Sequence, residues 1–225
     1  MKVVLFGATG MIGRGALREC LLDPDVTAVV AVGRGATGQQ HAKLRELVVR
    51  DLFDLSSVAS SLDGADACFY CIGITAAGTS EADYRRVTYD LALSATSALA
   101  KRNPGMTLVH VSAAGASTAG RGPAWARVKG ETEAAVLKLP FKDVYVLRPF
   151  LVQPLHGITS RTGWYRAFYA AFAPFAPIWK ALLPGYVTTT ERVGKAMLIL
   201  ARRGAPKRVL ETGDINQLVR EHSVA

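Results

Sequence analysis

The chain alternates between short apolar runs and longer segments in which apolar residues recur at helical spacing. The apolar runs, each bounded by glycine or polar turn residues, predict strands near residues 2–6, 26–32, 45–50, 66–72, 106–112, 143–148 and 207–211. The segments between them predict helices over 11–22, 55–61, 80–102, 123–138, 164–183 and 190–203. The strands are rich in valine, leucine and isoleucine with little polar alternation, which is typical of strands covered by helices on both faces.

This order of elements predicts an α/β fold, a Rossmann-type doubly wound parallel sheet of about seven strands with helices on both faces. With 225 residues, half of them hydrophobic, the chain can bury one such core but hardly two, so we expect a single domain over 1–225. The strand-poor range 153–205 is expected to form a small substrate lobe within it. Ligands bind such sheets at the carboxyl ends of the strands, where the strand order reverses.

A glycine-rich turn follows the first predicted strand and opens an amphipathic helix. It reads Gly7-Ala8-Thr9-Gly10-Met11-Ile12-Gly13. Glycine at these three spacings permits a tight turn, close approach of the backbone to a pyrophosphate and close helix packing, while the free amides of the helix start attract the anion. The context of strand, turn and helix therefore predicts a dinucleotide site.

Three later loops are expected to contact the same dinucleotide. The second strand ends in Gly33-Arg34, where NAD-preferring sites present a carboxylate; arginine there can pair with a 2′-phosphate, which favours NADP over NAD unless Arg34 is only an exposed loop residue. After the third strand, Asp51-Leu52 brings a carboxylate that could accept from the adenine amino group, and Asp54 could instead cap the next helix. Cys71-Ile72-Gly73 offers small residues beside a ribose or phosphate, or a simple strand-ending turn.

Charge and cysteine content narrow the classes of function. The net charge is +9, but lysine and arginine are scattered and form no motif, so we expect a solvated face and no nucleic-acid partner. An odd count of three cysteines without a preceding signal peptide favours a reducing, cytoplasmic location. Cys68 and Cys71 have redox-motif spacing inside an apolar strand, which favours core packing.

Two further classes of site are not expected. The longest uncharged apolar stretch, 167–179, is interrupted by two prolines and is too short for an integral membrane segment. Histidines, cysteines and carboxylates show no metal-ligand spacing, so no metal is expected.

Taken together, these segments resemble a known family, the atypical or extended short-chain dehydrogenase/reductases, and within them the NAD(P)-binding epimerase-like and Tat-interacting-protein-like oxidoreductases. The resemblance covers nearly the whole chain. Besides the glycine turn, it rests on Val32-Gly33-Arg34, Asp51-Leu52, Cys71-Ile72-Gly73, Val111-Ser112-Ala113-Ala114-Gly115, Val128-Lys129-Gly130-Glu131 and Leu147-Arg148-Pro149.

The resemblance implies catalytic roles for Ser112, which would polarise the substrate oxygen, and Lys129, which would hold the cofactor ribose. It also places the loop from Pro149 to Val152 against the nicotinamide. The family's proton-donating tyrosine would stand thirteen residues after Ser112, where this chain has Trp125, whose indole has no usable acidity. Three explanations stay open: another acid serves, only hydride transfer is needed, or no turnover occurs. Candidates for the acid are Tyr70, Tyr84, Tyr89 and a water bound to Lys129.

Bulky aromatics concentrate in 163–186, which could be core, a pocket wall, or a surface for a second copy, a protein partner or a membrane. His156 is expected to overhang the nicotinamide, whereas His110 is expected to be buried in its strand. The leading hypothesis is an NADP(H)-dependent oxidoreductase acting on a small carbonyl or quinone-like compound. The alternatives are a catalytically weak or inactive NAD(P)-binding regulatory protein that meets a partner through 160–186, and a sugar-nucleotide epimerase-like enzyme.

Overall fold

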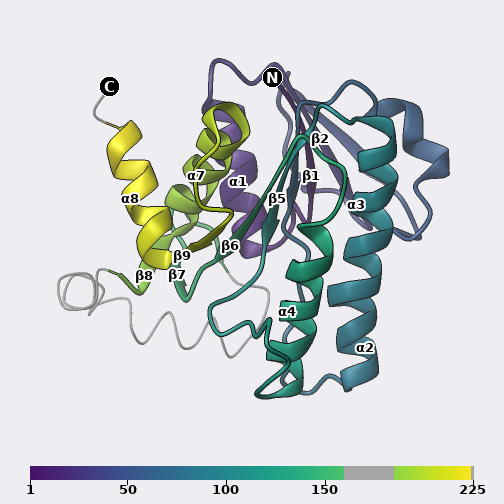
Figure 1. Cartoon of the computed structure of the whole chain (residues 1–225). Coiled ribbons are helices and arrows are strands. Elements are labelled where there is room, and N and C mark those ends of the chain that lie inside the picture. Colours follow the sequence, from purple (N-terminus) through teal and green to yellow (C-terminus); the bar gives the residue numbers. More distant parts are fainter. Residues whose placement is uncertain (160–184, 224–225) are drawn as a thin grey trace.

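The computed structural model describes residues 1–159 and 185–223, and its core is a parallel sheet (Figure 1). In the described residues this sheet has seven strands in the order β3-β2-β1-β4-β5-β6-β9. Their bounds are β1 Lys2–Phe6, β2 Ala28–Gly33, β3 Leu44–Val48, β4 Ala67–Tyr70, β5 Thr107–Val111, β6 Asp143–Arg148 and β9 Val209–Glu211. Every neighbouring pair is parallel. The expected Rossmann-type, doubly wound sheet is therefore confirmed.

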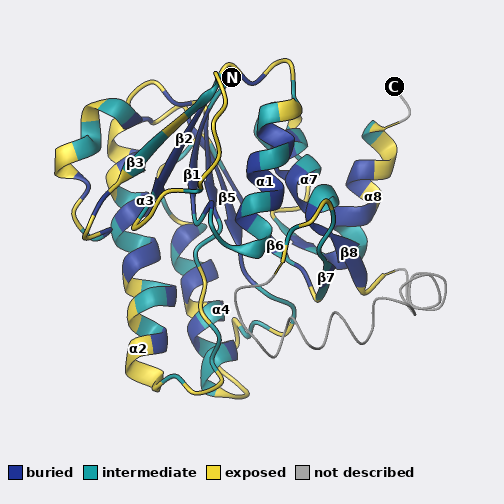
Figure 2. Cartoon of the chain, turned by 180° about the vertical axis from the view of Figure 1, so that it is seen from behind, coloured by how far each residue is buried: buried dark blue, intermediate teal, exposed yellow. Residues whose placement is uncertain are grey.

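Helices cover both faces of the sheet (Figure 1). On one face lie α1 (Met11–Leu22), α7 (Thr190–Arg203) and α8 (Thr212–His222), and on the other lie α3 (Leu91–Arg102) and α4 (Ala124–Val136). Each face has its own hydrophobic core, and β4 and β5 are buried along their whole length (Figure 2). Burial on both faces explains why these strands read as continuous apolar runs.

Close packing between α1 and α7 depends on a small residue. A Cβ placed on Gly15 would lie 2.6 Å from the carbonyl oxygen of Thr190, so only glycine lets the two helices approach this closely. Although α7 falls within the range 153–205 of the expected substrate lobe, it packs on α1 and covers the main sheet. The lobe itself stays a prediction, because its centre lies outside the described residues.

Two predicted helices differ in detail from the structure. The segment expected at 55–61 is the 3₁₀ helix η1 (Ser56–Leu62), preceded by Asp54, whose carboxylate accepts from the Ser56 amide at 2.9 Å. Serine side chains compete for backbone hydrogen bonds and so favour such short turns over an α-helix. The helix expected at 80–102 is interrupted: α2 (Glu81–Arg85) passes through the π-helical turn η2 (Arg86–Asp90) into α3.

Sequence patterns missed three elements and predicted one that is not described. Strands β7 (Leu151–Gln153) and β8 (Val187–Thr189) form a small parallel sheet, and each is too short to give a period. Helix α8 begins directly after β9 with a reciprocal cap between Glu211 and Asp214. The helix expected at 164–183, and the partner surface expected at 160–186 apart from its last two residues, lie outside the described residues.

Candidate functional site

The glycine turn joins β1 to α1 and admits no side chain at two of its glycines. Gly7 adopts φ +78°, and a Cβ there would lie 2.7 Å from the carbonyl carbon of Cys71 in the loop after β4. A Cβ on Gly13 would lie 2.0 Å from the Gly7 carbonyl oxygen, so the first turn of α1 sits directly on the turn. The Gly10 amide donates to the same oxygen at 2.9 Å. The turn is therefore compact, and its backbone can come close to a bound anion.

The amides of the first turn of α1 have no side-chain cap. Gly10 is the cap residue, it offers no side chain, and the first turn, from Met11 to Gly13, contains no acidic residue. Because these amides have no partner within the helix and stand at its positive end, they favour an anion. Ala8 beside them is buried and holds the turn against the core.

The order of the strands brings the turn and the loop after β4 together. Strand β1 pairs with β2 on one side and with β4 on the other, so the chain reverses its direction of travel across the sheet at β1. The Cys71 amide donates to the Phe6 carbonyl at 3.0 Å, which continues the β1 and β4 pairing into the loop. Ile72 and Gly73 follow directly, with open space around Gly73. A ligand crevice is expected at such a reversal point.

Cysteines of this region are packed in the core. Cys68 is buried in β4 and Cys71 is half-buried at its end. Burial raises the pKa of both thiols, which keeps them protonated at neutral pH and disfavours redox chemistry by a thiolate.

Residues expected at the adenosine end follow two neighbouring strands. Arg34 comes directly after β2 and is exposed; within the described part of the chain its guanidinium forms no ion pair. Asp51 follows β3 and is exposed, and its carboxylate accepts from the Phe53 amide at 2.9 Å. Leu52 is buried in the core and fixes this loop. The Val49 amide donates to the Gly33 carbonyl, so the two loops start side by side.

Ser112 follows a strand of the same sheet, and Lys129 lies on the next helix. Ser112 follows β5, its side chain is 6% exposed, and its hydroxyl has no hydrogen-bond partner among the described residues. Lys129 stands on α4. Burial lowers the pKa of its ammonium from 10.5 to about 8, and the Glu133 carboxylate partly opposes this shift. Buried polar groups normally have partners, so the orphaned Ser112 hydroxyl fits a site built for a polar ligand.

Trp125, the residue that the resemblance sets at the family's tyrosine position, lies at the start of α4. A Cβ on Gly115, which adopts φ +85°, would lie 3.2 Å from the outer ring carbon of Trp125, so the indole packs against the loop after β5. One turn further along α4, a Cβ on Gly130 would lie 2.0 Å from the Ser117 carbonyl oxygen. The indole and Gly130 together hold the loop that carries Ser112 close to α4.

Two further polar residues lie on the neighbouring strands β4 and β5. Tyr70 was named from the sequence only as a candidate acid, and His110 was not assigned to the site. Tyr70 and His110 are register partners on β4 and β5, and their rings stack with centroids 5.4 Å apart. Both are buried, as was expected of His110, and neither the Tyr70 hydroxyl nor His110 Nδ1 has a partner among the described residues. Burial and the charge of Lys129 lower the pKa of His110 to about 3, which keeps the ring neutral. The signal available in the sequence was the two-residue spacing from His110 to Ser112, which places both on one face of β5.

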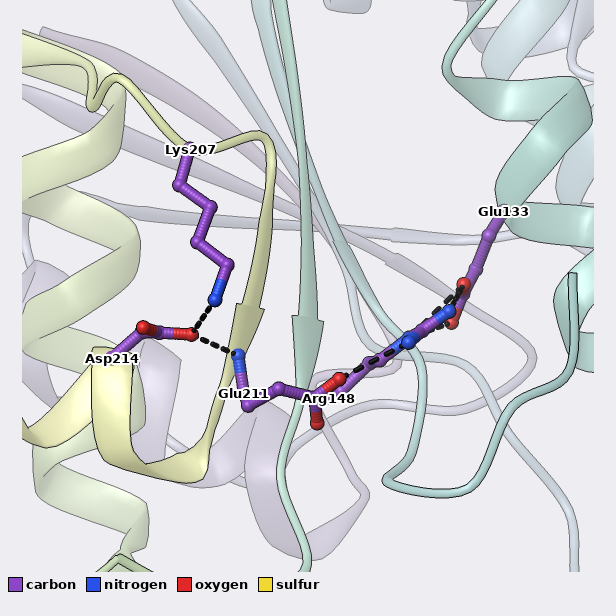
Figure 3. Close-up of polar contacts among 5 residues, drawn as sticks. All are labelled: Glu133, Arg148, Lys207, Glu211 and Asp214. Atoms are coloured by element: carbon purple, nitrogen blue, oxygen red, sulfur yellow. Dashed lines mark hydrogen bonds and ion pairs between the residues drawn. The ribbon is translucent and has the colours of Figure 1, made fainter.

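A buried ion pair ties α4 to β6 one turn beyond Lys129 (Figure 3). The side chain of Glu133 is fully buried and accepts three hydrogen bonds from Arg148, two from Nε at 3.0 and 3.1 Å and one from Nη2 at 2.5 Å. The other terminal nitrogen of Arg148 donates to Glu211 on β9 at 3.0 Å. Sequence reasoning missed Glu133, whose only signal was its four-residue spacing from Lys129 on the same helix face.

The loop after β6 lies beside the loop that carries Ser112. The Pro149 carbonyl accepts from the Ala114 amide at 3.1 Å, and Val152 is buried in β7. His156 was expected over the nicotinamide, but its Nε2 lies 2.8 Å from an oxygen of Glu191 on α7, so the structure ties it to that helix. Lys195 contacts the other oxygen of the same carboxylate.

Among the described residues, no helix is both long and apolar enough to cross a bilayer. No group of three or more metal-ligating side chains occurs in this part of the chain.

Comparisons with known proteins support a nucleotide-binding role. Residues 7–138 match the model of a family described as NAD(P)H-binding. Protein fmp52, mitochondrial, from Emericella nidulans is 30% identical over 203 residues, which is 87% of this chain and 84% of that protein. The same mitochondrial name recurs among relatives from Eremothecium gossypii and Saccharomyces cerevisiae.

Solved structures share the fold at low sequence identity. A short chain dehydrogenase family protein from Francisella tularensis superimposes with a TM-score of 0.64 at 14% identity, covering 90% of this chain and 91% of its own. The Bordetella bronchiseptica enzyme WbmF, in complex with NAD⁺, superimposes with a TM-score of 0.65 at 16% identity, covering 98% of this chain and 77% of its own. The resemblance to short-chain dehydrogenases and epimerase-like proteins is confirmed.

The relatives also correct one expectation. A cytoplasmic location, inferred from the cysteine content and the missing signal peptide, is contradicted by relatives that are named as mitochondrial proteins. A reducing environment for cysteines is not specific to one compartment, so the cysteine count could not make this distinction. From the matched residues 7–138 and the relative that aligns over most of both chains, the chain belongs to the NAD(P)H-binding family.

Proposed function

We propose that the chain is an NADP(H)-dependent oxidoreductase of the short-chain dehydrogenase/reductase type that acts on a small carbonyl or quinone-like compound. One observation carries the proposal: the glycine turn and the orphaned Ser112 hydroxyl follow the carboxyl ends of β1 and β5, which flank β4 in one parallel sheet, and the desolvated Lys129 ammonium of α4 acts electrostatically on His110 of β5. An anion site after β1 and an orphaned hydroxyl after β5 suit a dinucleotide and the group that it reduces.

Residues along this edge would divide the binding between them. The amides after Gly10 would hold the diphosphate, Lys129 the ribose, and the backbone from Pro149 to Val152 the nicotinamide. NADP(H), when bound, supplies or accepts the hydride. Ser112 would donate its hydroxyl proton as a hydrogen bond to the substrate oxygen, which orients the carbonyl and stabilises charge that develops on it.

The preference for NADP(H) rests on Arg34. Gly33 and Gly35 flank it, and the residues that directly follow β2 include no carboxylate. The Glu46 carboxylate of β3 reaches this loop, where it accepts a hydrogen bond from the Thr37 amide. The exposed guanidinium, which forms no ion pair among the described residues, can make paired hydrogen bonds to that phosphate.

The test is a binding measurement followed by turnover. Calorimetry with NADPH and with NADH should give saturable heats, tighter for NADPH. Consumption of NADPH is then followed with 9,10-phenanthrenequinone and a panel of aromatic aldehydes. We expect turnover above the protein-free rate, abolished by Lys129→Ala and retained by the exposed control Lys138→Ala. Tight NADPH binding without consumption of NADPH for any acceptor would contradict the oxidoreductase.

A second candidate function is a binding protein in which the dinucleotide is a structural or signalling ligand. The packing of Trp125 against Gly115 favours it, because this residue supports a loop and offers no acid. This candidate predicts that Lys129→Ala lowers NADPH affinity in calorimetry while no reaction is lost. A robust turnover that disappears in the variant would exclude it.

A further inference from the structure

The proposed reaction needs a proton donor, and the three tyrosines named from the sequence do not fit that role. Tyr70 is fully buried within β4, and burial raises the pKa of its hydroxyl. Tyr84 is buried in α2. Tyr89 lies in η2 with the Arg85 guanidinium 4.5 Å from its ring centre, and Arg85 is itself paired with Glu131 on the outer side of α4.

Lys129 is placed differently from these tyrosines. It lies on the first turns of α4, one turn after Trp125, and this helix contacts the loop after β5 at Gly115 and Ser117. Among the described residues, no side chain forms a hydrogen bond or ion pair with its ammonium. A cation with three donors and no protein partner can transfer one of its protons to a ligand without breaking a protein contact.

The charged side chains around Lys129 form ion pairs with residues other than Lys129. On its own helix, the Glu133 carboxylate accepts three hydrogen bonds from Arg148 of β6 (Figure 3). Glu133 forms no ion pair with Lys129 among the described residues. On β5, His110 is neutral and has an orphaned ring nitrogen. On α2, the charges of Arg85 and Glu81 pair with Glu131 and Arg127 of α4.

This arrangement leaves Lys129 as a partly buried cation whose nearest carboxylate is held by another cation. Burial then favours the neutral amine, and the pKa of Lys129 falls to about 8, which is close to the working pH of a general acid. If Arg148 did not hold Glu133, the carboxylate could turn to Lys129 and fix its proton.

We propose that Lys129 itself donates the proton to the substrate oxygen, in place of the absent tyrosine, and that the Glu133 and Arg148 pair is its positioning device. The inference rests on the proposed function. In the direction of reduction, the carbonyl carbon accepts a hydride, with its electron pair, from the reduced nicotinamide, and the carbonyl π pair moves onto oxygen. That oxygen takes a proton from the Lys129 ammonium to give an alcohol and oxidised cofactor. The neutral Lys129 amine then regains a proton from solvent.

The first experiment measures the proton on Lys129 without any turnover. The purified protein is labelled briefly with acetic anhydride across a range of pH, and the acetylation of Lys129 and of the exposed reference Lys138 is read by mass spectrometry. Only the neutral amine reacts, so the labelling of Lys129 should reach half its maximum near pH 8, below that of Lys138. A midpoint for Lys129 equal to or above that of Lys138 would overturn the inference.

The second experiment separates the proton from the charge. Lys129→Arg keeps a cation for the ribose, but guanidinium does not release a proton in this pH range. We expect NADPH affinity by calorimetry within about threefold of the parent, and kcat with 9,10-phenanthrenequinone to fall on the order of 100-fold. In the parent, kcat should fall as pH rises through about 8, because the acid form is lost; the matched control Lys138→Arg should keep that profile.

The outcomes distinguish the inference from the function on which it rests. Parent-like kcat and pH profile in Lys129→Arg would overturn the inference and leave an NADP(H)-dependent oxidoreductase in place. Absence of turnover in the parent protein would refute the proposed function, even where the labelling midpoint of Lys129 is low. Glu133→Gln tests the positioning pair: freed from its carboxylate neighbour, Lys129 should label at still lower pH, and an unchanged midpoint would remove Glu133 from this role.

Discussion

Replacing Arg148 by methionine should destabilise the protein more than any other loss of a single ion pair among the described residues. Glu133 has no exposed side-chain surface and receives three hydrogen bonds from Arg148. Methionine fills a similar volume but leaves a buried carboxylate without its cation. Breaking a buried pair in this way costs about 3–5 kcal/mol, because the stranded charge keeps its desolvation penalty.

The chain offers a control with the same geometry at the surface. Arg102 binds Asp63 through two hydrogen bonds of 2.6 Å, yet both side chains are more than two-fifths exposed. Arg102→Met should therefore cost far less, since water can solvate the remaining carboxylate. The double variant Glu133→Gln with Arg148→Met removes both buried charges and should recover much of the loss.

The assay is urea unfolding followed by circular dichroism, with the free energy of unfolding extrapolated to water. At neutral pH we expect Arg148→Met to lose several kcal/mol relative to the parent. A loss below about 1 kcal/mol, or one no larger than that of Arg102→Met, would refute the reasoning that burial gives this pair its importance.

Three further predictions address the nucleotide site and its surroundings. Gly13→Ala sets a Cβ 2.0 Å from the Gly7 carbonyl oxygen. It should lower NADPH affinity in calorimetry at least tenfold, which is a loss of about 1.4 kcal/mol in binding free energy. Gly35→Ala, where a Cβ meets open space, should leave the affinity unchanged, and equal affinities for the two variants would contradict the anion site. In the parent, His110 must stay neutral in the folded state, so the free energy of unfolding should fall by about 1.4 kcal/mol for each pH unit between pH 6.5 and pH 3. His110→Phe should remove this acid sensitivity, and urea midpoints that run in parallel for both proteins across that pH range would refute it. Arg34→Asp should weaken NADPH more than NADH, and an equal effect would take Arg34 out of the adenosine site.

Local chemistry made the glycine turn and the sheet predictable. The requirement for glycine at Gly13 arises from the Gly7 carbonyl six residues earlier, so it is visible as spacing in the sequence. Gly7 is restricted by its positive φ and also by Cys71 in the loop after β4, a contact between distant segments. Burial of β4 and β5 on both faces leaves continuous apolar runs, which a period analysis detects. The order of the strands then follows from the handedness of the crossovers.

Tertiary placement made the rest unpredictable. Nothing local reveals that Glu133 on a helix faces Arg148 on a strand, because that contact depends on how α4 crosses β6. The contact of His156 with Glu191 is likewise a tertiary one, because α7 brings this carboxylate against the loop after β7. Strands β7 and β8 have three residues each, and their pairing joins segments more than thirty residues apart, which a local period cannot report.

The central claim is that the uncapped start of α1 holds the diphosphate of a nicotinamide dinucleotide. Calorimetry of the purified chain with NADPH, run beside the Gly13→Ala variant, tests it most directly. If the start of α1 holds the diphosphate, the parent should bind NADPH saturably with one-to-one stoichiometry, and Gly13→Ala should bind it with markedly lower affinity. No saturable heat from either NADPH or NADH at millimolar concentration would contradict it.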